Sequence, residues 1–214
     1  MPENRHMRKL RMTEIIQALK VEFPNSKCSL NFKSPFQLLV ATILSAQCTD
    51  DRVNQVTKKL FSKYPNVGDY SSLTVDEIGK EIYSTGFFNN KARSIKNMTV
   101  IIMNKYDGEI PDTLEELVKL PGVGRKTANV VMGTAFNVPS IVVDTHVIRI
   151  MNLLNFVAID NPVKIEMSLM KIVEKDVWTL FTHLFIDHGR KTCIARRPQC
   201  DRCVISHLCP SMKS

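Results

Sequence analysis

The sequence predicts an all-α protein, because helix start signals recur along its 214 residues while strand-like patterns are nearly absent. Capping residues, prolines at first helical positions and apolar residues at helical spacing mark one short helix after another. The strand-like exception is Ser140–Val143, which is too isolated to build a sheet and which we interpret as a buried connector. No internal repeat or Gly/Ser-rich linker occurs, so any domain division should fall at short turns near Asn31 and Pro139.

The first group of helix start signals consists of single capping residues. A cap followed by proline at the first helical position predicts helices that begin at Ser34-Pro35 and at Asn161-Pro162. Asp50 is expected to cap the helix that comes next after the one begun at Ser34.

The second group consists of capping boxes and long amphipathic runs. Thr74 and Thr113 are each followed three residues later by glutamate, which predicts a capping box at both helix starts. Apolar residues at helical spacing predict one long helix over Asn89–Tyr106 and a last helix over Trp178–His188. Together, these helix start signals predict a protein made mostly of short helices.

The segment Leu120–Ala128 (LPGVGRKTA) lies between the helix capped by Thr113 and an apolar helix expected over Thr127–Phe136. Gly122 and Gly124 permit a tight turn whose N–H groups can approach a ligand with no Cβ in the way. A helix N-terminus directly after such a turn forms an anion site. The segment predicts a helix–hairpin–helix that grips a DNA backbone, and the alternative is an ordinary joint between two helices.

Lys126 falls in the first turn of that second helix, where we expect its side chain to be partly buried. A neutral amine at this place could attack a sugar C1′ and form a Schiff base. It could equally contact a phosphate, and the sequence leaves both interpretations open.

Asp144 ends the apolar run Ser140–Val143 and precedes the helical pattern of Val147 and Ile150, so we expect it to cap a helix. Opposite a lysine on another helix, the same carboxylate could accept a proton or stabilise positive charge on a ribose. Its position alone favours the capping role.

Four of the six cysteines gather near the C-terminal end in the pattern C-x6-C-x2-C-x5-C. They are Cys193, Cys200, Cys203 and Cys209. Four thiolates in so short a segment predict a metal site, and the spacing favours an iron–sulfur cluster only modestly over zinc. The alternative of two disulfides needs an oxidising compartment, and residues 1–10 lack the apolar core of a secretory signal.

The net charge of +8 favours a polyanionic partner, and the cysteine segment concentrates this charge, with only Asp201 opposing it. The basic residues there are Arg190, Lys191, Arg196, Arg197 and Arg202. We therefore expect this segment to meet phosphates.

No run of about 18 apolar residues occurs, so we expect no membrane partner. With no targeting signal in the sequence, the expected location is the bacterial cytoplasm, at the nucleoid, and the expected state is a monomer.

Several of these segments, in their order and spacing, resemble the endonuclease III family of DNA glycosylases. The segments are Gly122–Ala128, Val143–His146, His188–Arg190, the four cysteines and Ser45–Asp50. The resemblance extends over nearly the whole chain. It implies excision of oxidised pyrimidines from double-stranded damaged DNA in base excision repair, followed by β-elimination at the abasic site.

The resemblance also implies roles for the candidate residues. Lys126 would be the Schiff-base nucleophile, Asp144 the activating carboxylate, and the four cysteines the ligands of a [4Fe–4S] cluster. The fold would comprise a six-helix domain over 28–138 that contains the hairpin, and a cluster domain formed by 1–27 plus 139–214. DNA would lie in the cleft between them, with the damaged nucleotide flipped out toward Lys126 and Asp144.

Two loop residues would act on the DNA stack in such an enzyme. Gln47 would fill the hole that the flipped base leaves, and Phe87 would be the wedge in the opposite strand, where the family often has leucine. Cys48 also departs from the small residue expected there. The other expected DNA contacts are Gly122, Val123, Gly124, Arg125, Thr127, His146, Arg190, Lys191, Arg196 and Arg197.

Two alternative functions remain open at the level of sequence. An adenine-mismatch glycosylase of the same superfamily would lack a lysine at the position of Lys126 and carry a further C-terminal domain, whereas this chain stops five residues after Cys209. A non-catalytic, cluster-bearing or zinc-bearing DNA-binding module would bind DNA without cleaving it. In that module Lys126 would only hold phosphate.

Overall fold

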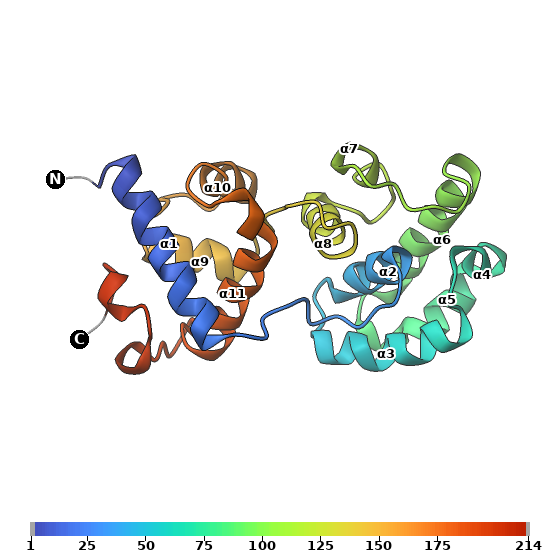
Figure 1. The fold of residues 1–214 in the computed structure, drawn as a ribbon. Helices are drawn as coiled ribbons and strands as arrows, with labels where there is room; N and C mark the ends of the chain where they lie inside the picture. Colours follow the sequence, from blue (N-terminus) through green and yellow to red (C-terminus); the bar gives the residue numbers. More distant parts are fainter. Residues whose placement is uncertain (1–2, 213–214) are drawn as a thin grey trace. The chain divides into compact units, whose positions relative to one another are not determined.

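The computed structural model describes residues 3–212, and within that range it contains eleven α-helices, four short 3₁₀ turns and no strand (Figure 1). The all-α prediction is therefore confirmed. None of the helices in the described range is both long and apolar enough to cross a membrane.

The chain divides into two compact units. One is Ser29–Val138, and the other joins Met1–Cys28 to Pro139–Ser214. The first unit contains seven α-helices, all within its described residues, where the family resemblance implies six; one of the seven, α7, is a single turn.

The unit Ser29–Val138 has one mostly apolar helix, α2, among its seven helices. They are α2 (Pro35–Ser45), α3 (Asp50–Lys63), α4 (Val67–Ser72), α5 (Val75–Ile82), α6 (Phe88–Lys105), α7 (Leu114–Leu117) and α8 (Arg125–Ala135), with the 3₁₀ turn η1 (Tyr83–Thr85). Every residue of α2 from Phe36 to Leu44 is buried, as expected for a helix that is apolar all round. It packs against α3, α6 and α8 and so forms the centre of this unit.

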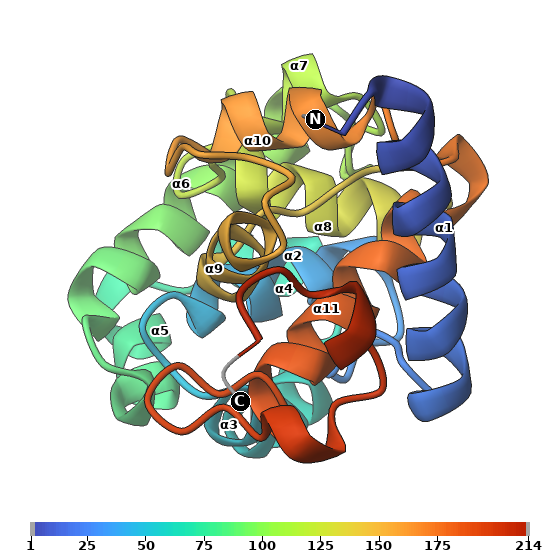
Figure 2. The ribbon, with the colours of Figure 1, turned by 90° about the vertical axis from the view of Figure 1, so that its left-hand side faces the viewer.

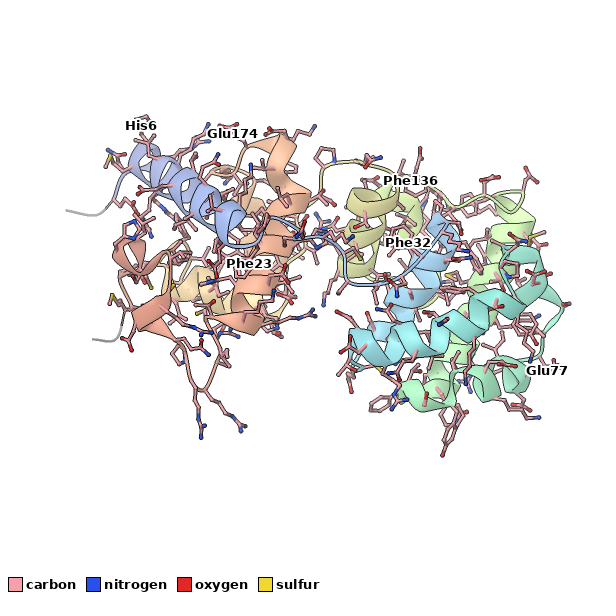
Figure 3. The ribbon with its side chains drawn as sticks, turned by 60° about the horizontal axis from the view of Figure 1, so that its bottom comes forward. His6, Phe23, Phe32, Glu77, Phe136 and Glu174 are labelled. Atoms are coloured by element: carbon pink, nitrogen blue, oxygen red, sulfur yellow. The ribbon has the colours of Figure 1, made fainter. Side chains whose placement is uncertain are left out.

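The helix starts of this unit mostly follow the predicted caps. The Ser34 hydroxyl accepts a hydrogen bond from the Gln37 N–H, and Thr74 forms a complete capping box with Glu77, which Figure 3 labels. The predicted cap Asp50 is wrong by one residue. Thr49 caps α3 instead, and Asp50 is the first helical residue. There its negative charge interacts favourably with the positive end of the helix dipole.

The capping box predicted at Thr113 is only half formed. The Thr113 hydroxyl accepts the Glu116 N–H at 3.4 Å, as predicted. The Glu116 carboxylate does not return to the cap, because it accepts hydrogen bonds from the Lys105 ammonium at 2.8 Å and the Tyr106 hydroxyl at 2.5 Å. A stronger tertiary partner therefore replaces the local one.

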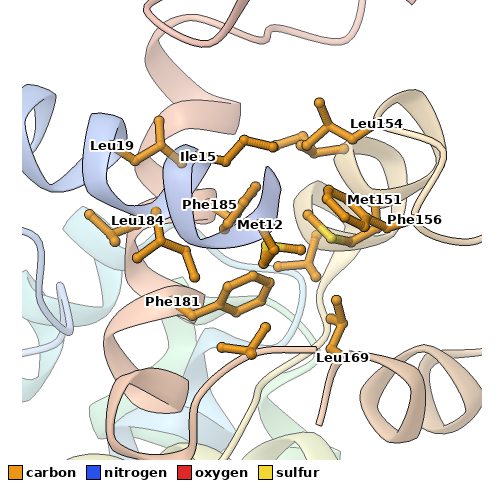
Figure 4. Close-up of a cluster of buried hydrophobic side chains, with 14 of the residues drawn as sticks. Met12, Ile15, Leu19, Met151, Leu154, Phe156, Leu169, Phe181, Leu184 and Phe185 are labelled. Carbon is orange, nitrogen blue, oxygen red and sulfur yellow. The ribbon is translucent and has the colours of Figure 1, made fainter. Parts of the chain in front are cut away.

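The second unit is built from both ends of the chain. Its helices are α1 (Arg5–Glu22), α9 (Thr145–Leu153), α10 (Pro162–Leu169) and α11 (Trp178–Lys191). Figure 4 shows the core where these helices meet, with Met12 and Ile15 from α1, Met151 from α9, and Phe181 and Phe185 from α11. All five side chains are fully buried.

Two irregular segments complete this unit. The connector Ser140–Val143 is buried, as predicted, and the Val142 N–H donates a hydrogen bond of 2.9 Å to the Thr182 hydroxyl of α11. Beyond α11 the chain runs to residue 212 as loops and the short 3₁₀ turns η3 (Cys200–Arg202) and η4 (Ser206–Leu208) (Figure 2). This last segment carries the four clustered cysteines.

Candidate functional site

The turn between α7 and α8 is fixed by packing. Leu120 and Val123 anchor it with buried side chains, and the Val123 N–H donates to the Leu120 carbonyl at 3.0 Å. Gly122 has φ +80°, and a Cβ there would lie 2.7 Å from the Cβ of Ser94 on α6. Only glycine fits this position, as the sequence pattern suggested. Because the Val123 side chain points into the core, any contact this residue makes with DNA must use its backbone.

The N-terminus of α8 follows directly from this turn. Gly124 is its capping residue and provides no side-chain hydrogen bond, and the first turn holds no acidic residue. A Cβ at Gly124 would meet nothing within 4 Å, so a ligand can approach the backbone closely. The helix begins at Arg125, two residues earlier than predicted, which places Arg125, Lys126 and Thr127 in its first turn. This arrangement suits an anion.

The Lys126 side chain is exposed, so the prediction of partial burial was wrong. Position in the first turn of a helix does not require burial, because one side of that turn can face solvent: Lys126 is exposed, whereas Arg125 and Thr127 are half-buried. An exposed amine beside an anion site can reach a group attached to a bound phosphate. A sugar is such a group.

Asp144 caps α9 as predicted. Its Oδ1 accepts a hydrogen bond of 2.9 Å from the Val147 N–H, and the residue is half-buried at the end of the buried connector. No described residue donates a hydrogen bond to the second oxygen, Oδ2. The carboxylate is thus held by one oxygen while the other can meet a substrate.

His146 lies in the first turn of α9 against α11. A Cβ at Gly189 would lie 2.7 Å from the His146 ring, so glycine at that position allows the two helices to approach. Burial lowers the pKa of His146, with Arg149 and Arg190 adding to the effect and Asp144 opposing it. The lowered pKa favours the neutral ring, which interacts through hydrogen bonds and not through charge.

The four clustered cysteines come together in this unit. All six cysteines of the chain lie in the described range and none of them forms a disulfide, so the disulfide alternative is not what the structure shows. Cys193, Cys200, Cys203 and Cys209 line one cavity, whose other walls include Ile150 and Ile205. Burial raises the pKa of the Cys193 and Cys203 thiols, because an apolar environment disfavours the thiolate.

This cavity fits an iron–sulfur cluster better than a single zinc ion. Zinc requires its sulfur ligands within about 2.3 Å of one ion. Within residues 3–212 no group of three or more His, Cys, Asp or Glu side chains is gathered tightly enough to hold one ion. Four thiols spread around an apolar cavity suit a larger group with one iron for each sulfur. When bound, a [4Fe–4S] cluster would be held by these four cysteines and would tie the loop to the helices.

Two residues that support the cysteine segment were not predicted. Arg149 of α9 donates hydrogen bonds through Nη2 to the carbonyls of Gly189 and Cys193. The His188 ring is 2% exposed, its Nε2 lies 3.9 Å from the Cys203 sulfur, and burial together with Arg149 lowers its pKa to about 4. A polar residue within an otherwise apolar helical stripe was the available signal for both.

The basic residues around the cysteines lie on the surface. Arg190, Lys191, Arg196, Arg197 and Arg202 are all exposed. The Lys191 ammonium lies 5.3 Å from the ring centre of Phe23, which Figure 3 labels near the end of α1. The segment thus presents positive charge to solvent, as the sequence predicted.

Gln47 and Phe87 lie in two loops of the other unit. Both have left-handed backbone conformations, with φ +53° and +49°, and both side chains are exposed. Phe87 is 66% exposed, which is unusual for an aromatic side chain of a folded domain. The structure thus brings the hairpin residues together in one unit, and Asp144, His146 and the cysteines together in the other.

Comparison with known proteins agrees with this arrangement of sites. The family model described as "HhH-GPD superfamily base excision DNA repair protein" matches residues 40–175, more than half of the chain. A second model, the "Iron-sulfur binding domain of endonuclease III", matches residues 193–209. The chain therefore belongs to the helix–hairpin–helix superfamily of base excision DNA repair proteins.

Individual relatives narrow this class. Endonuclease III of Synechocystis sp. is 47% identical over 208 residues, covering 97% of this chain and 95% of its own, and endonuclease III of Escherichia coli K12 is 41% identical, covering 95% and 96%. A solved non-covalent endonuclease III–DNA complex superposes with a TM-score of 0.91 at 45% identity, covering 95% of both chains. The chain belongs to the endonuclease III family, whose members are bifunctional DNA glycosylases and abasic-site lyases of base excision repair.

Proposed function

We propose that this enzyme excises oxidised pyrimidines from double-stranded DNA and then cleaves the abasic site, with Lys126 as nucleophile and Asp144 as the carboxylate that assists it. The observation that carries the proposal is the exposed amine of Lys126 in the first turn of α8, directly after a turn built for an anion. A DNA phosphate bound by the backbone there would bring the attached sugar within reach of the amine.

The chemistry follows from an amine acting on C1′ of the sugar. The Lys126 Nζ attacks C1′ while the bond from C1′ to the base breaks and the base leaves with a proton. Opening of the sugar ring gives an imine, loss of a proton from C2′ breaks the bond between C3′ and its oxygen, and water then releases the lysine. Asp144 accepts the proton of the attacking amine and stabilises the positive charge that develops on the sugar.

The choice of oxidised pyrimidines follows from the cost of flipping. A pyrimidine that has lost aromaticity stacks poorly, so it leaves the helix at a lower cost than an intact base. It is also a better leaving group. A solved relative with 45% identity is described as a trapped endonuclease III–DNA covalent intermediate, which supports a nucleophile of this kind here.

The remaining predicted residues bind and shape the DNA. In this proposal Gly122, Val123, Gly124, Arg125 and Thr127 bind phosphate at the hairpin, and His146, Arg190, Lys191, Arg196 and Arg197 do so in the cluster domain. Gln47 fills the space of the flipped base and Phe87 separates the opposite strand. The unit Ser29–Val138 would thus serve as the hairpin domain and the other unit as the cluster domain. We further propose that the enzyme acts as a monomer on bacterial nucleoid DNA in the cytoplasm.

Borohydride trapping tests this assignment. A duplex with one thymine glycol is incubated with the wild-type protein, Lys126→Ala and Lys119→Ala, and borohydride is added to reduce any imine. We expect a covalent adduct with the wild type and with Lys119→Ala, whose exposed ammonium lies in the same hairpin and pairs with Glu116. Lys126→Ala should bind an abasic duplex and form no adduct.

Two results would contradict the proposal. An adduct of Lys126→Ala at the wild-type level would assign the nucleophile to another residue. Release of adenine opposite 8-oxoguanine, with no action on thymine glycol, would contradict the proposed substrate class.

A further inference from the structure

Lys91 is a buried cation in the middle of the hairpin domain. It stands near the start of α6, and its side chain and backbone together are only 6% exposed. Burial lowers the pKa of its ammonium. No carboxylate in the described part of the chain forms an ion pair with it. A charge buried in this way costs free energy unless polar groups surround it, so its partners show what it does.

The partners of Lys91 are two backbone carbonyls from different parts of the chain. Its Nζ donates hydrogen bonds of 2.8 Å to the Leu44 carbonyl and of 2.8 Å to the Thr85 carbonyl. Leu44 lies in the last turn of α2, where the helix dipole is negative and carbonyls lack helical partners. Thr85 ends the turn η1 and is buried. One ammonium therefore joins the C-terminal end of α2 to the C-terminal end of η1.

Each of these two helical segments, α2 and η1, leads directly into a loop with an exposed side chain. The chain after Leu44 reaches Gln47, and the chain after Thr85 passes Gly86 to Phe87. Gln47, Gly86 and Phe87 all have φ in the left-handed region, at +53°, +70° and +49°. For residues other than glycine this conformation is costly, and it persists only where the surrounding structure holds it.

A purely structural role explains these contacts less well. Position 91 falls on the buried stripe of α6 with Ala92, Ile95 and Met98, where an apolar side chain would fill the space without the cost of a buried charge. A lysine offers what an apolar residue cannot, which is one group bonded to both loop bases at once. The position of Lys91 between the two loop bases indicates that it fixes the distance between the two loops.

We propose that Lys91 is a positioning residue that sets the Gln47 and Phe87 loops at a fixed separation, so that both side chains enter the DNA stack in register when a base is flipped. This inference rests on the proposed roles of Gln47 and Phe87 in DNA binding. Lys91 itself touches neither the substrate nor the reacting atoms. Its effect is confined to the flipping step, and the chemistry at Lys126 proceeds without it.

The test compares lesions that must be flipped with lesions that need not be. Single-turnover excision of thymine glycol is measured in a fully paired duplex and in an unpaired bubble, for the wild type, Lys91→Met and Lys96→Met. Lys96 is the matched control, because it lies on the same helix and also donates to a backbone carbonyl, that of Ser71, but in an exposed place. Lys91→Met should lower the paired rate on the order of 10- to 100-fold and leave the bubble rate unchanged. Lys96→Met should change neither rate.

A merely structural lysine gives a different result. If Lys91→Met lowers the paired and bubble rates by the same factor, or lowers only the melting temperature, the inference is overturned. Should Lys91→Met fail to fold, Lys91→Gln retains a neutral donor for one carbonyl and allows the same comparison of rates. Fluorescence of 2-aminopurine placed opposite the lesion reports the disturbed stack directly and should fall with the paired rate.

A second background separates this inference from the proposed function. In a Gln47→Ala/Phe87→Ala protein the paired rate should already be low, and adding Lys91→Met should lower it little further. A full additional loss would overturn the positioning role while leaving the roles of Gln47 and Phe87 intact. If Gln47→Ala/Phe87→Ala has no effect at all, the proposed roles of those two residues fail, and the inference about Lys91 fails with them.

Discussion

The helices α8 and α9 begin in opposite ways. Gly124 precedes α8 and has no side chain with which to cap it, and the first turn carries Arg125 and Lys126 but no acid. Asp144 precedes α9 and caps it with its own carboxylate. One N-terminus carries no negative charge of its own, whereas the other already holds one.

This difference shows how one physical property serves two purposes. A helix N-terminus attracts negative charge through its N–H groups and its dipole. At α8 the attraction can act on a phosphate of the substrate, and at α9 it orients a carboxylate of the protein. Because Asp144 both caps α9 and supplies the carboxylate, a substitution that removes its side chain removes both roles at once. Such a variant cannot tell the two roles apart.

Asp144→Asn separates these two roles and has the largest expected effect. Asparagine caps helices about as well as aspartate, so the free energy of unfolding should change by less than about 0.5 kcal/mol. The single-turnover rate should fall by a factor on the order of 10²–10⁴, because the amide cannot accept the proton. Chemical unfolding and excision rates are measured on the same sample. Lost stability with an unchanged rate would leave Asp144 as a cap alone.

Gly122→Ala should break the turn before α8. The added Cβ would meet Ser94 at 2.7 Å in a backbone conformation with φ +80°, so we expect a loss of about 1–3 kcal/mol of unfolding free energy. Gly68→Ala is the control, since a Cβ there meets nothing within 4 Å and φ is not positive. Equal stabilities of the two variants in urea titrations would show that the turn can relax.

Gly124→Asp should make the start of α8 resemble that of α9. The new side chain has open space and can cap the helix, so stability should stay equal or rise by up to about 1 kcal/mol. DNA affinity should fall by about tenfold, because the carboxylate occupies and repels from the anion site. Gly124→Asn supplies a neutral cap and should lose less affinity. Unchanged DNA affinity of Gly124→Asp would show that no DNA phosphate binds at the N-terminus of α8.

The arginines of the cysteine segment should have the smallest effect, because they act through charge alone. Removing Arg196 and Arg197 together should reduce the slope of log affinity against log salt by about two, if each contacts one phosphate. Removal of the exposed pair Lys58 and Lys59 changes the net charge equally and serves as the control. Equal slopes for both variants would show that the cysteine segment has no special part in binding.

Much of this architecture could be predicted from local sequence. Helix starts at Ser34, Thr74 and Asn161 depend on hydrogen bonds within one turn, and the structure has them as predicted. The turn at Gly122 and the four-cysteine segment were also recognisable, because spacing along the chain dictates both.

The errors and omissions have a shared cause, which is contact between residues distant in sequence. Glu116 leaves its predicted box for Lys105 and Tyr106, which lie on and just after α6. The interpretation of Lys91 requires knowledge that Leu44 and Thr85 come together, and local patterns do not contain it. Lys126 was expected to be partly buried and is exposed, and the burial of a side chain likewise depends on tertiary packing.

The joining of both chain ends in one unit has a consequence for biosynthesis. The stretch from Ser29 to Val138 is continuous and can fold while the ribosome is still making the rest. Helix α1 emerges first, yet its apolar face must wait for α9 and α11, which are translated last. During synthesis of the remaining residues 139–214, about a third of the chain, the nascent protein therefore has a complete Ser29–Val138 unit and an N-terminal helix whose apolar face is still exposed. We expect chaperones to bind that helix in this period.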